Sequence, residues 1–134
     1  RECARIALED FGGDLRKVIR EPVSAAKKAL RAFPGIGEPG AEKILLFARE
    51  EPALALESNG LRVLVRLGFA REQKSYSTTY RLVRAAVAPE LGADFDALIA
   101  AHQLLRRHGQ EVCRHTTPRC ELCPLAKECP ESTT

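Results

Sequence analysis

Four cysteines close to the C-terminus constrain this chain more than any other feature of its sequence. They follow the spacing C-x6-C-x2-C-x5-C and are Cys113, Cys120, Cys123 and Cys129. Thiolates in one short loop can surround a single inorganic centre, and the wider outer spacings let the chain close around a bulky one. The pattern therefore favours a cubane 4Fe-4S cluster.

Two other uses of these cysteines remain open. Structural zinc also takes four thiolates, but zinc sites usually pair two short C-x2-C knuckles, and only Cys120 and Cys123 form one here. Disulfide bonds are the weaker alternative, because the total of five cysteines is odd and nothing else suggests secretion. The fifth, Cys3, shares an apolar helical stripe with Ile6 and Phe11, so we expect it to pack in the core.

The composition suits one soluble globular unit with a modest core, with 134 residues of which 45% are hydrophobic and 29% charged. The formal net charge of +3 says little about partners, because thiolates bound to a cluster would lower it. No apolar run approaches the length of a membrane span and no signal peptide is visible, so we expect a cytoplasmic protein. The chain opens on Arg1 inside a helical pattern, and we expect an N-terminal segment to be missing.

The spacing of apolar residues is helical almost throughout, with Gly or Pro at the breaks and no convincing strand. We therefore predict an all-α fold. The expected helices cover residues 2–11, a short segment after Asp14, residues 22–33, a segment from about Pro39 to residue 48, and stretches near 61–67, 77–88 and 94–108. His102 falls on the apolar side of the last one, and we expect it to be a hydrogen-bonded core histidine.

A second informative feature is the sequence FPGIG at residues 33–37, between two helical patterns. It predicts a tight hairpin in which Gly35 and Gly37 adopt backbone angles that are closed to other residues. Amide N–H groups at the start of the following helix could then bind a phosphate without reading base sequence. The alternative is an ordinary corner between helices in which Ile36 fills the core, but the flanking proline favours a DNA-binding helix-hairpin-helix.

With both features in this order, the sequence resembles the iron-sulfur branch of the helix-hairpin-helix DNA glycosylases, the endonuclease III and adenine-DNA glycosylase superfamily. The resemblance runs from the first helix to Cys129 and implies two helical lobes with a cleft for double-stranded DNA, acting in base-excision repair as a monomer. By this likeness, residues 1–50 would end the helical barrel lobe, with the helix-hairpin-helix at about 23–49. Residues 51–134 would form the cluster lobe, with its iron-sulfur loop at 113–129.

The resemblance also implies a carboxylate after the hairpin, which stabilises the cationic sugar as the glycosidic bond breaks or activates the attacking nucleophile. In the family an Asp precedes a segment like Asn-x-x-Arg-Val, and here ESNGLRV at residues 57–63 puts Glu57 in that place. Glutamate adds a methylene, and a shift of about 1 Å can reduce catalysis on the order of a hundredfold. The alternative is that Glu57 only caps or solvates the next helix.

Bifunctional relatives carry a lysine two residues after the hairpin's second glycine, which forms a Schiff base with the sugar. This sequence has Pro39 there, and Lys43, one turn later on roughly the same face, is the remaining candidate. Such a lysine is more often simply solvated. We therefore expect a monofunctional glycosylase that uses Glu57 and water. A non-catalytic DNA-binding protein on the same scaffold is the alternative, and a glycosylase/lyase using Lys43 is the third.

The loop between the first two cysteines carries Arg114, His115 and Arg119 and is stiffened by Pro118. In the family the matching loop contacts DNA phosphates, and the cluster holds it in shape. We therefore expect these three side chains, together with the hairpin residues 35–37, to contact DNA. The alternative is a basic loop that is only solvated.

Overall fold

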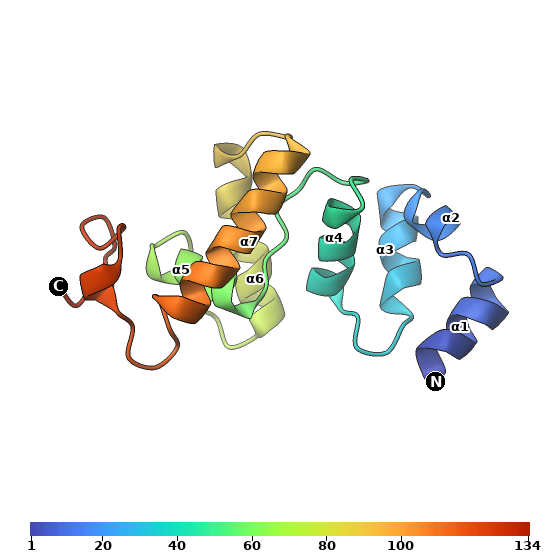
Figure 1. Cartoon of the computed structure of the whole chain (residues 1–134), viewed down its shortest axis with the longest axis horizontal. Helices are drawn as coiled ribbons and strands as arrows, with labels where there is room; N and C mark the ends of the chain where they lie inside the picture. The colour runs from blue at the N-terminus through green and yellow to red at the C-terminus, as the bar shows by residue number, and fades with distance from the viewer. The chain divides into compact units, whose positions relative to one another are not determined.

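The computed structural model describes all residues from Arg1 to Thr134 and contains only helices and connecting segments (Figure 1). The predicted all-α class is confirmed. The chain divides into two compact units, Arg1–Ala53 and Leu54–Thr134. None of the helices combines the length and the apolar character that crossing a membrane requires.

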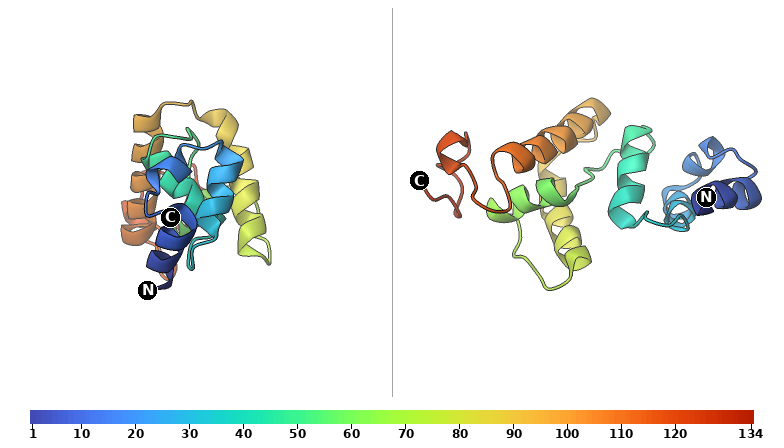
Figure 2. Two further views of the ribbon diagram at one scale, coloured as in Figure 1. Left: turned by 90° about the vertical axis from the view of Figure 1, so that its right-hand side faces the viewer. Right: turned by 60° about the horizontal axis from the view of Figure 1, so that its bottom comes forward.

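The N-terminal unit consists of four helices, close to the predicted ranges: α1 (Glu2–Phe11), α2 (Arg16–Ile19), α3 (Val23–Arg31) and α4 (Glu38–Phe47). Helix α1 ends where predicted, at Gly12, whose φ of 61° is left-handed. Helices α3 and α4 lie side by side, joined by the hairpin (Figures 1 and 2). Their spacing of small and apolar residues therefore gave the local structure correctly.

Small residues let α3 and α4 approach closely. Ala26 and Leu30 of α3 and Ala41 and Leu45 of α4 form a buried cluster, of which both alanines are 0% exposed. Beside this cluster, Lys27 Nζ lies 3.6 Å from a carboxylate oxygen of the buried Glu42 and 3.3 Å from one of Glu51. The charge of Lys27 compensates two carboxylates that would otherwise be costly to bury.

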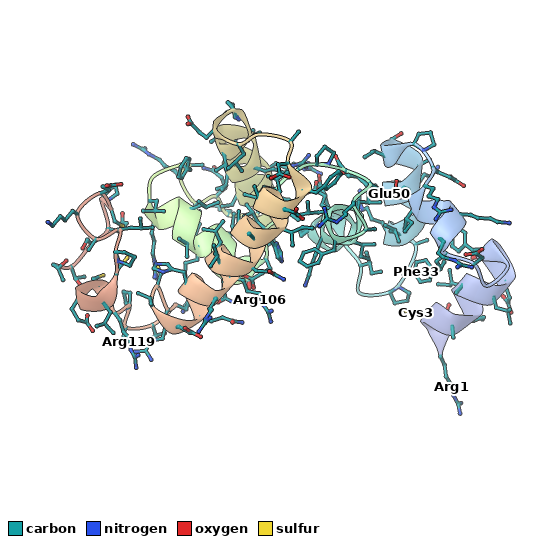
Figure 3. The ribbon with its side chains drawn as sticks, turned by 45° about the horizontal axis from the view of Figure 1, so that its top comes forward. Arg1, Cys3, Phe33, Glu50, Arg106 and Arg119 are labelled. Carbon is teal, nitrogen blue, oxygen red and sulfur yellow. The ribbon has the colours of Figure 1, made fainter.

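The expectation that Cys3 packs in the core is wrong. Its side chain is exposed, and Sγ lies 3.8 Å from the carbonyl oxygen of Pro34, an exposed residue of the hairpin (Figure 3). Helix α1 instead buries Ile6, and Phe11 stacks on Phe33 with 5.7 Å between ring centroids. The buried stripe of α1 is thus narrower than the apolar stripe in its sequence.

The C-terminal unit contains three α-helices and two short 3-10 helices: α5 (Ser58–Arg66), α6 (Tyr76–Val87), η1 (Ala88–Glu90), α7 (Phe95–Glu111) and η2 (Cys120–Leu122). Helix α7 ends later than the predicted residue 108. The core side chains come mainly from α5, α6 and α7 and include Leu61, Leu64, Tyr80, Val83 and Leu98.

Two glycines bring α5 and α7 into close contact. A Cβ atom added to Gly109 of α7 would lie 2.5 Å from the carbonyl oxygen of Asn59, and one added to Gly60 of α5 would lie 3.2 Å from Cβ of Leu105. The backbones therefore meet where no side chain fits between them. This contact fixes the N-terminal turn of α5, which carries Glu57.

Candidate active site and cysteine centre

Glu57 is the N-cap of α5, and both of its carboxylate oxygens accept hydrogen bonds. Oε1 accepts the backbone N–H of Gly60 at 2.7 Å, and Oε2 accepts the side-chain N–H of Asn59 at 2.9 Å. The residue is half-buried. A carboxylate at a helix N-terminus also interacts favourably with the helix dipole. The structure therefore gives Glu57 the capping role, and it also holds this carboxylate in one defined place with part of its surface accessible.

The segment that leads into Glu57 is anchored from two sides. The N–H of Leu56 donates to the hydroxyl of Tyr80 on α6 at 3.4 Å, and Nδ1 of His102 on α7 lies 2.7 Å from the carbonyl oxygen of Ala55. Ala55, Leu56, Tyr80 and His102 are all buried. The prediction of a hydrogen-bonded core histidine is confirmed, and its partner shows that it positions the chain just before the candidate carboxylate.

A chain of hydrogen bonds runs from Glu57 toward the first cysteine. Oδ1 of Asn59 accepts from Nη2 of Arg62 at 3.0 Å, and the same Nη2 donates to the carbonyl oxygen of Gly109 at 2.6 Å. Nε of Arg62 donates to the carbonyl oxygen of Cys113 at 3.0 Å. Burial lowers the pKa of Arg62, and the neighbouring Arg66 lowers it further.

Arg66 continues this array one helical turn later. Its Nη1 donates to the carbonyl oxygen of Arg114 at 2.7 Å and lies 3.4 Å from Sγ of Cys113, while Nη2 donates to the carbonyl oxygen of His115 at 3.0 Å. Neither of these two arginines of α5 was predicted from the sequence to be a site residue. The signal was present, because positions 59, 62 and 66 lie on one face of a helix.

All four C-terminal cysteines line a single cavity of about 190 Å³. The other walls are partly apolar and include Val112, Pro118 and Ala126. None of the cysteines forms a disulfide, and no three His, Cys, Asp or Glu side chains converge closely enough to hold a single metal ion. Four thiols that line one cavity are a donor set that suits an iron-sulfur cluster and also suits zinc.

Polar groups lie close to three of the four cysteine sulfurs. Nε2 of His108 lies 3.5 Å from Sγ of Cys123. Similarly, Nη1 of Arg66 lies 3.4 Å from Sγ of Cys113. Hydrogen bonds from the side chain and backbone of Thr133 lower the pKa of the Cys120 thiol. Metal centres bind the thiolate form, and hydrogen bonds to the sulfurs stabilise it.

The loop that begins at Cys113 is closed at its base by the carbonyl oxygen of Val112, which accepts the N–H groups of Arg114 at 2.9 Å and Arg119 at 2.8 Å. Arg114 is half-buried, and its Nη2 donates to the carbonyl oxygen of Thr117 at 3.3 Å. Arg114 therefore braces the loop from inside. His115 and Arg119 are exposed, and Arg119 is labelled in Figure 3.

The hairpin has one glycine that its backbone requires, not two. Gly35 has a φ of 86°, which side chains disfavour, whereas Gly37 has φ −96° and ψ −167°, which any residue can adopt. The expectation that Gly37 adopts backbone angles closed to other residues is therefore wrong, and Gly37 is the N-cap residue of α4.

Ile36 packs against the buried cluster between α3 and α4. This contact agrees with the alternative in which Ile36 fills the core at a corner between two helices. Lys43 is exposed on α4.

Serine substitutions should separate the two glycines. We expect Gly35→Ser to destabilise the N-terminal unit by about 1 kcal/mol, because serine would be forced into a left-handed conformation. Gly37→Ser should be neutral or slightly stabilising, since serine is a good N-cap and a Cβ there meets only Cδ of Pro39 at 3.8 Å. Urea unfolding of both variants checks this, and equal losses would contradict it.

Comparisons with known proteins relate the chain to DNA repair enzymes. No family model matches it. It is 28% identical over 131 residues to endonuclease III of Bacillus subtilis, covering 98% of this chain and 53% of the relative. It is also 28% identical over 125 residues to the thymine/uracil-DNA glycosylase of Pyrobaculum aerophilum, covering 89% and 52%. The chain thus spans about half the length of the curated relatives it matches.

The fold is likewise found in solved structures. A trapped endonuclease III–DNA covalent intermediate matches with a TM-score of 0.72 and 24% identity, covering 97% of this chain and 55% of that one. A non-covalent endonuclease III–DNA complex matches with a TM-score of 0.69 and 22% identity, covering 96% and 54%. By sequence the chain is similar to these two DNA repair enzymes, and its fold is that of the endonuclease III structures.

Proposed function

We propose that this chain acts as part of a monofunctional DNA glycosylase, which hydrolyses the bond between a damaged or mispaired base and its sugar. The observation that supports this most is the fixed carboxylate of Glu57, in a chain similar to endonuclease III and to a thymine/uracil-DNA glycosylase. In this proposal the first unit supplies the hairpin and the end of the barrel lobe, and the second supplies the cluster lobe.

The proposed chemistry begins with extrusion of the target nucleotide from the duplex, which costs a few kcal/mol and least for damaged or mispaired bases. As the glycosidic bond breaks, positive charge develops on the sugar. Glu57 would stabilise that charge or accept a proton from the attacking water. The hydrogen bonds from Gly60 and Asn59 hold the carboxylate in place beforehand, so that little reorganisation is needed during the reaction.

Water is the proposed nucleophile because the chain offers no well-placed amine of its own. Pro39 is the second residue of α4, and its ring nitrogen lies within a peptide bond. Lys43 is exposed on the same helix. A Schiff base with the sugar would need a positioned, deprotonated lysine, so we assign lyase chemistry to neither residue.

We further propose that Cys113, Cys120, Cys123 and Cys129 hold a 4Fe-4S cluster. The common cavity of the four thiols supports this, as do the Arg66 and His108 side chains near two of the sulfurs. When bound, the cluster would cross-link this loop, and its reduction potential would depend on these hydrogen bonds. It would hold the loop that presents His115 and Arg119 to DNA phosphates.

Replacing Cys120 by serine should remove the cluster. We expect the purified variant to lose its iron, its inorganic sulfide and its visible absorption, and to melt at a lower temperature than the wild type, because a serine hydroxyl is a poor substitute for a thiolate ligand. Cys3→Ser is the matched control, since Cys3 is exposed and lies in the other unit, and it should keep the full iron content. A colourless wild-type protein with one zinc per chain would contradict the assignment.

The proposed activity is tested by incubating the full-length holo protein with duplexes that carry deaminated, oxidised, alkylated or mismatched bases. Strand scission is then scored with and without alkali. We expect cleavage at one class of lesion, and only after alkali, because water leaves an intact abasic sugar. Cleavage without alkali would contradict the monofunctional reading and implicate Lys43 or an amine elsewhere in the full-length protein.

A non-catalytic DNA-binding protein is the second candidate. One observation favours it: both carboxylate oxygens of Glu57 already serve the N-terminus of α5, as a purely structural cap would. Binding to every duplex of the panel without release of any base would support this candidate against the glycosylase.

A further inference from the structure

A second cavity of the C-terminal unit, of about 350 Å³, is not used by the proposed chemistry. It lies along α5, the segment before α6 and the start of α6, and His115 of the cysteine loop closes one side. Leu61 and Val65 supply apolar lining, and Ser58, the residue after Glu57, lies at its edge. The cavity therefore lies next to the candidate carboxylate, because α5 both lines the cavity and has Glu57 as its N-cap.

Positive charge dominates the walls of this cavity. The basic side chains of Arg62, Arg66 and Lys74 line it beside the imidazole of His115, and Glu72 is the one acidic residue. The guanidinium groups of Arg62 and Arg66 donate to carbonyl and amide oxygens and not to a carboxylate. An anion in the cavity would be attracted by these guanidinium groups.

An aromatic ring stands beside these cations. Tyr76 is 49% exposed and lines the cavity, and its ring stacks on that of the buried Tyr80 with 6.4 Å between centroids and 25° between planes. The hydroxyl of Tyr80 in turn accepts a hydrogen bond from the backbone N–H of Leu56. Tyr76 is therefore supported by the ring of a buried residue, which limits the movement of its side chain. A rigid ring loses little entropy when a flat ligand stacks on it.

A flat aromatic surface next to clustered cations fits one class of ligand. Proteins that bind unpaired nucleic acid combine basic side chains along the backbone with aromatic rings on which bases stack. We propose that this cavity holds one unstacked nucleotide of a DNA strand, with its base on Tyr76 and its phosphate near Lys74 and His115. The inference rests on the proposed DNA-directed function, and it adds a strand-binding site next to Glu57 within the C-terminal unit.

The test measures binding of the full-length holo protein to two fluorescent ligands, a short single-stranded oligothymidylate and a duplex with a tetrahydrofuran abasic analogue, across a salt series. Tyr76→Ala should weaken binding of the single strand about tenfold or more, while Tyr76→Phe, which keeps the ring, should bind like the wild type. Lys74→Gln should reduce the slope of log K against log[salt] by about 1, which is the change expected when one phosphate contact is lost. Thermal unfolding of each variant establishes that it is folded.

Two control variants lie outside the cavity. Phe69→Ala removes a ring that is 38% exposed, and Lys127→Gln removes an exposed charge, and both should leave single-strand binding unchanged. If the wild type binds the duplex but the cavity variants match these controls, the nucleotide site is wrong and the proposed function survives. If the wild type binds neither ligand, the proposed function fails and the site with it.

Discussion

Replacing Gly109 by alanine should destabilise the C-terminal unit by about 2–3 kcal/mol, the upper part of the range of about 1–3 kcal/mol found when a packed interior is overfilled. The added Cβ would lie 2.5 Å from the carbonyl oxygen and 2.8 Å from the carbonyl carbon of Asn59. Both are backbone atoms, so no side chain can rotate away, and α5 and α7 must move apart. No other glycine of the chain would bring an added Cβ so close to a backbone atom.

The same substitution should also disturb the candidate site. Asn59 donates a hydrogen bond to Glu57, and Arg62 donates one to the carbonyl oxygen of Gly109. A displacement of α5 would therefore change the geometry of both hydrogen bonds. We therefore expect weaker base release in Gly109→Ala even at temperatures where the variant is folded, because a misplacement of about 1 Å reduces catalysis on the order of a hundredfold.

Gly92→Ala is the matched control for stability. No heavy atom lies within 4 Å of a Cβ built at Gly92, and its φ is not left-handed. Its free energy of unfolding, measured in urea, should stay within about 0.5 kcal/mol of the wild-type value. Equal unfolding curves for Gly109→Ala and Gly92→Ala would show that α5 and α7 do not meet as described.

The helices could be predicted from the sequence because each is set by local pattern. Gly12 ends α1, the small and apolar positions of α3 and α4 face each other, and Asp94 caps α7. The gathering of the four cysteines in one cavity also agrees with their spacing, since short loops leave them little freedom. Local signals of this kind do not depend on the rest of the fold.

What the sequence could not supply depends on contacts between distant segments. The hydrogen bonds of Arg62 to Gly109 and Cys113 join residues about fifty positions apart, and α5 alone gives no sign of them. The hydrogen bond from the guanidinium of Arg114 to the carbonyl oxygen of Thr117 likewise depends on how the loop folds. The cavity beside Tyr76 likewise exists only once α5, α6 and the cysteine loop are assembled.

Replacing Glu57 by glutamine should abolish base release while leaving the fold intact. Glutamine has nearly the same shape, and its side-chain oxygen can still accept the N–H of Gly60. The negative charge is lost, however, and only that charge can stabilise a cationic sugar or take a proton from water. We expect a loss of about 100-fold or more in rate, with stability changed by about 1 kcal/mol at most.

The most direct test of the proposed glycosylase is the single-turnover rate of base release by the wild-type and Glu57→Gln proteins on the same lesion duplex, with DNA binding measured in parallel. Our account predicts release by the wild type and about 100-fold slower release by the variant, at nearly unchanged affinity. Equal rates for the two proteins would contradict it, and they would leave Glu57 as the N-cap of α5 and nothing more.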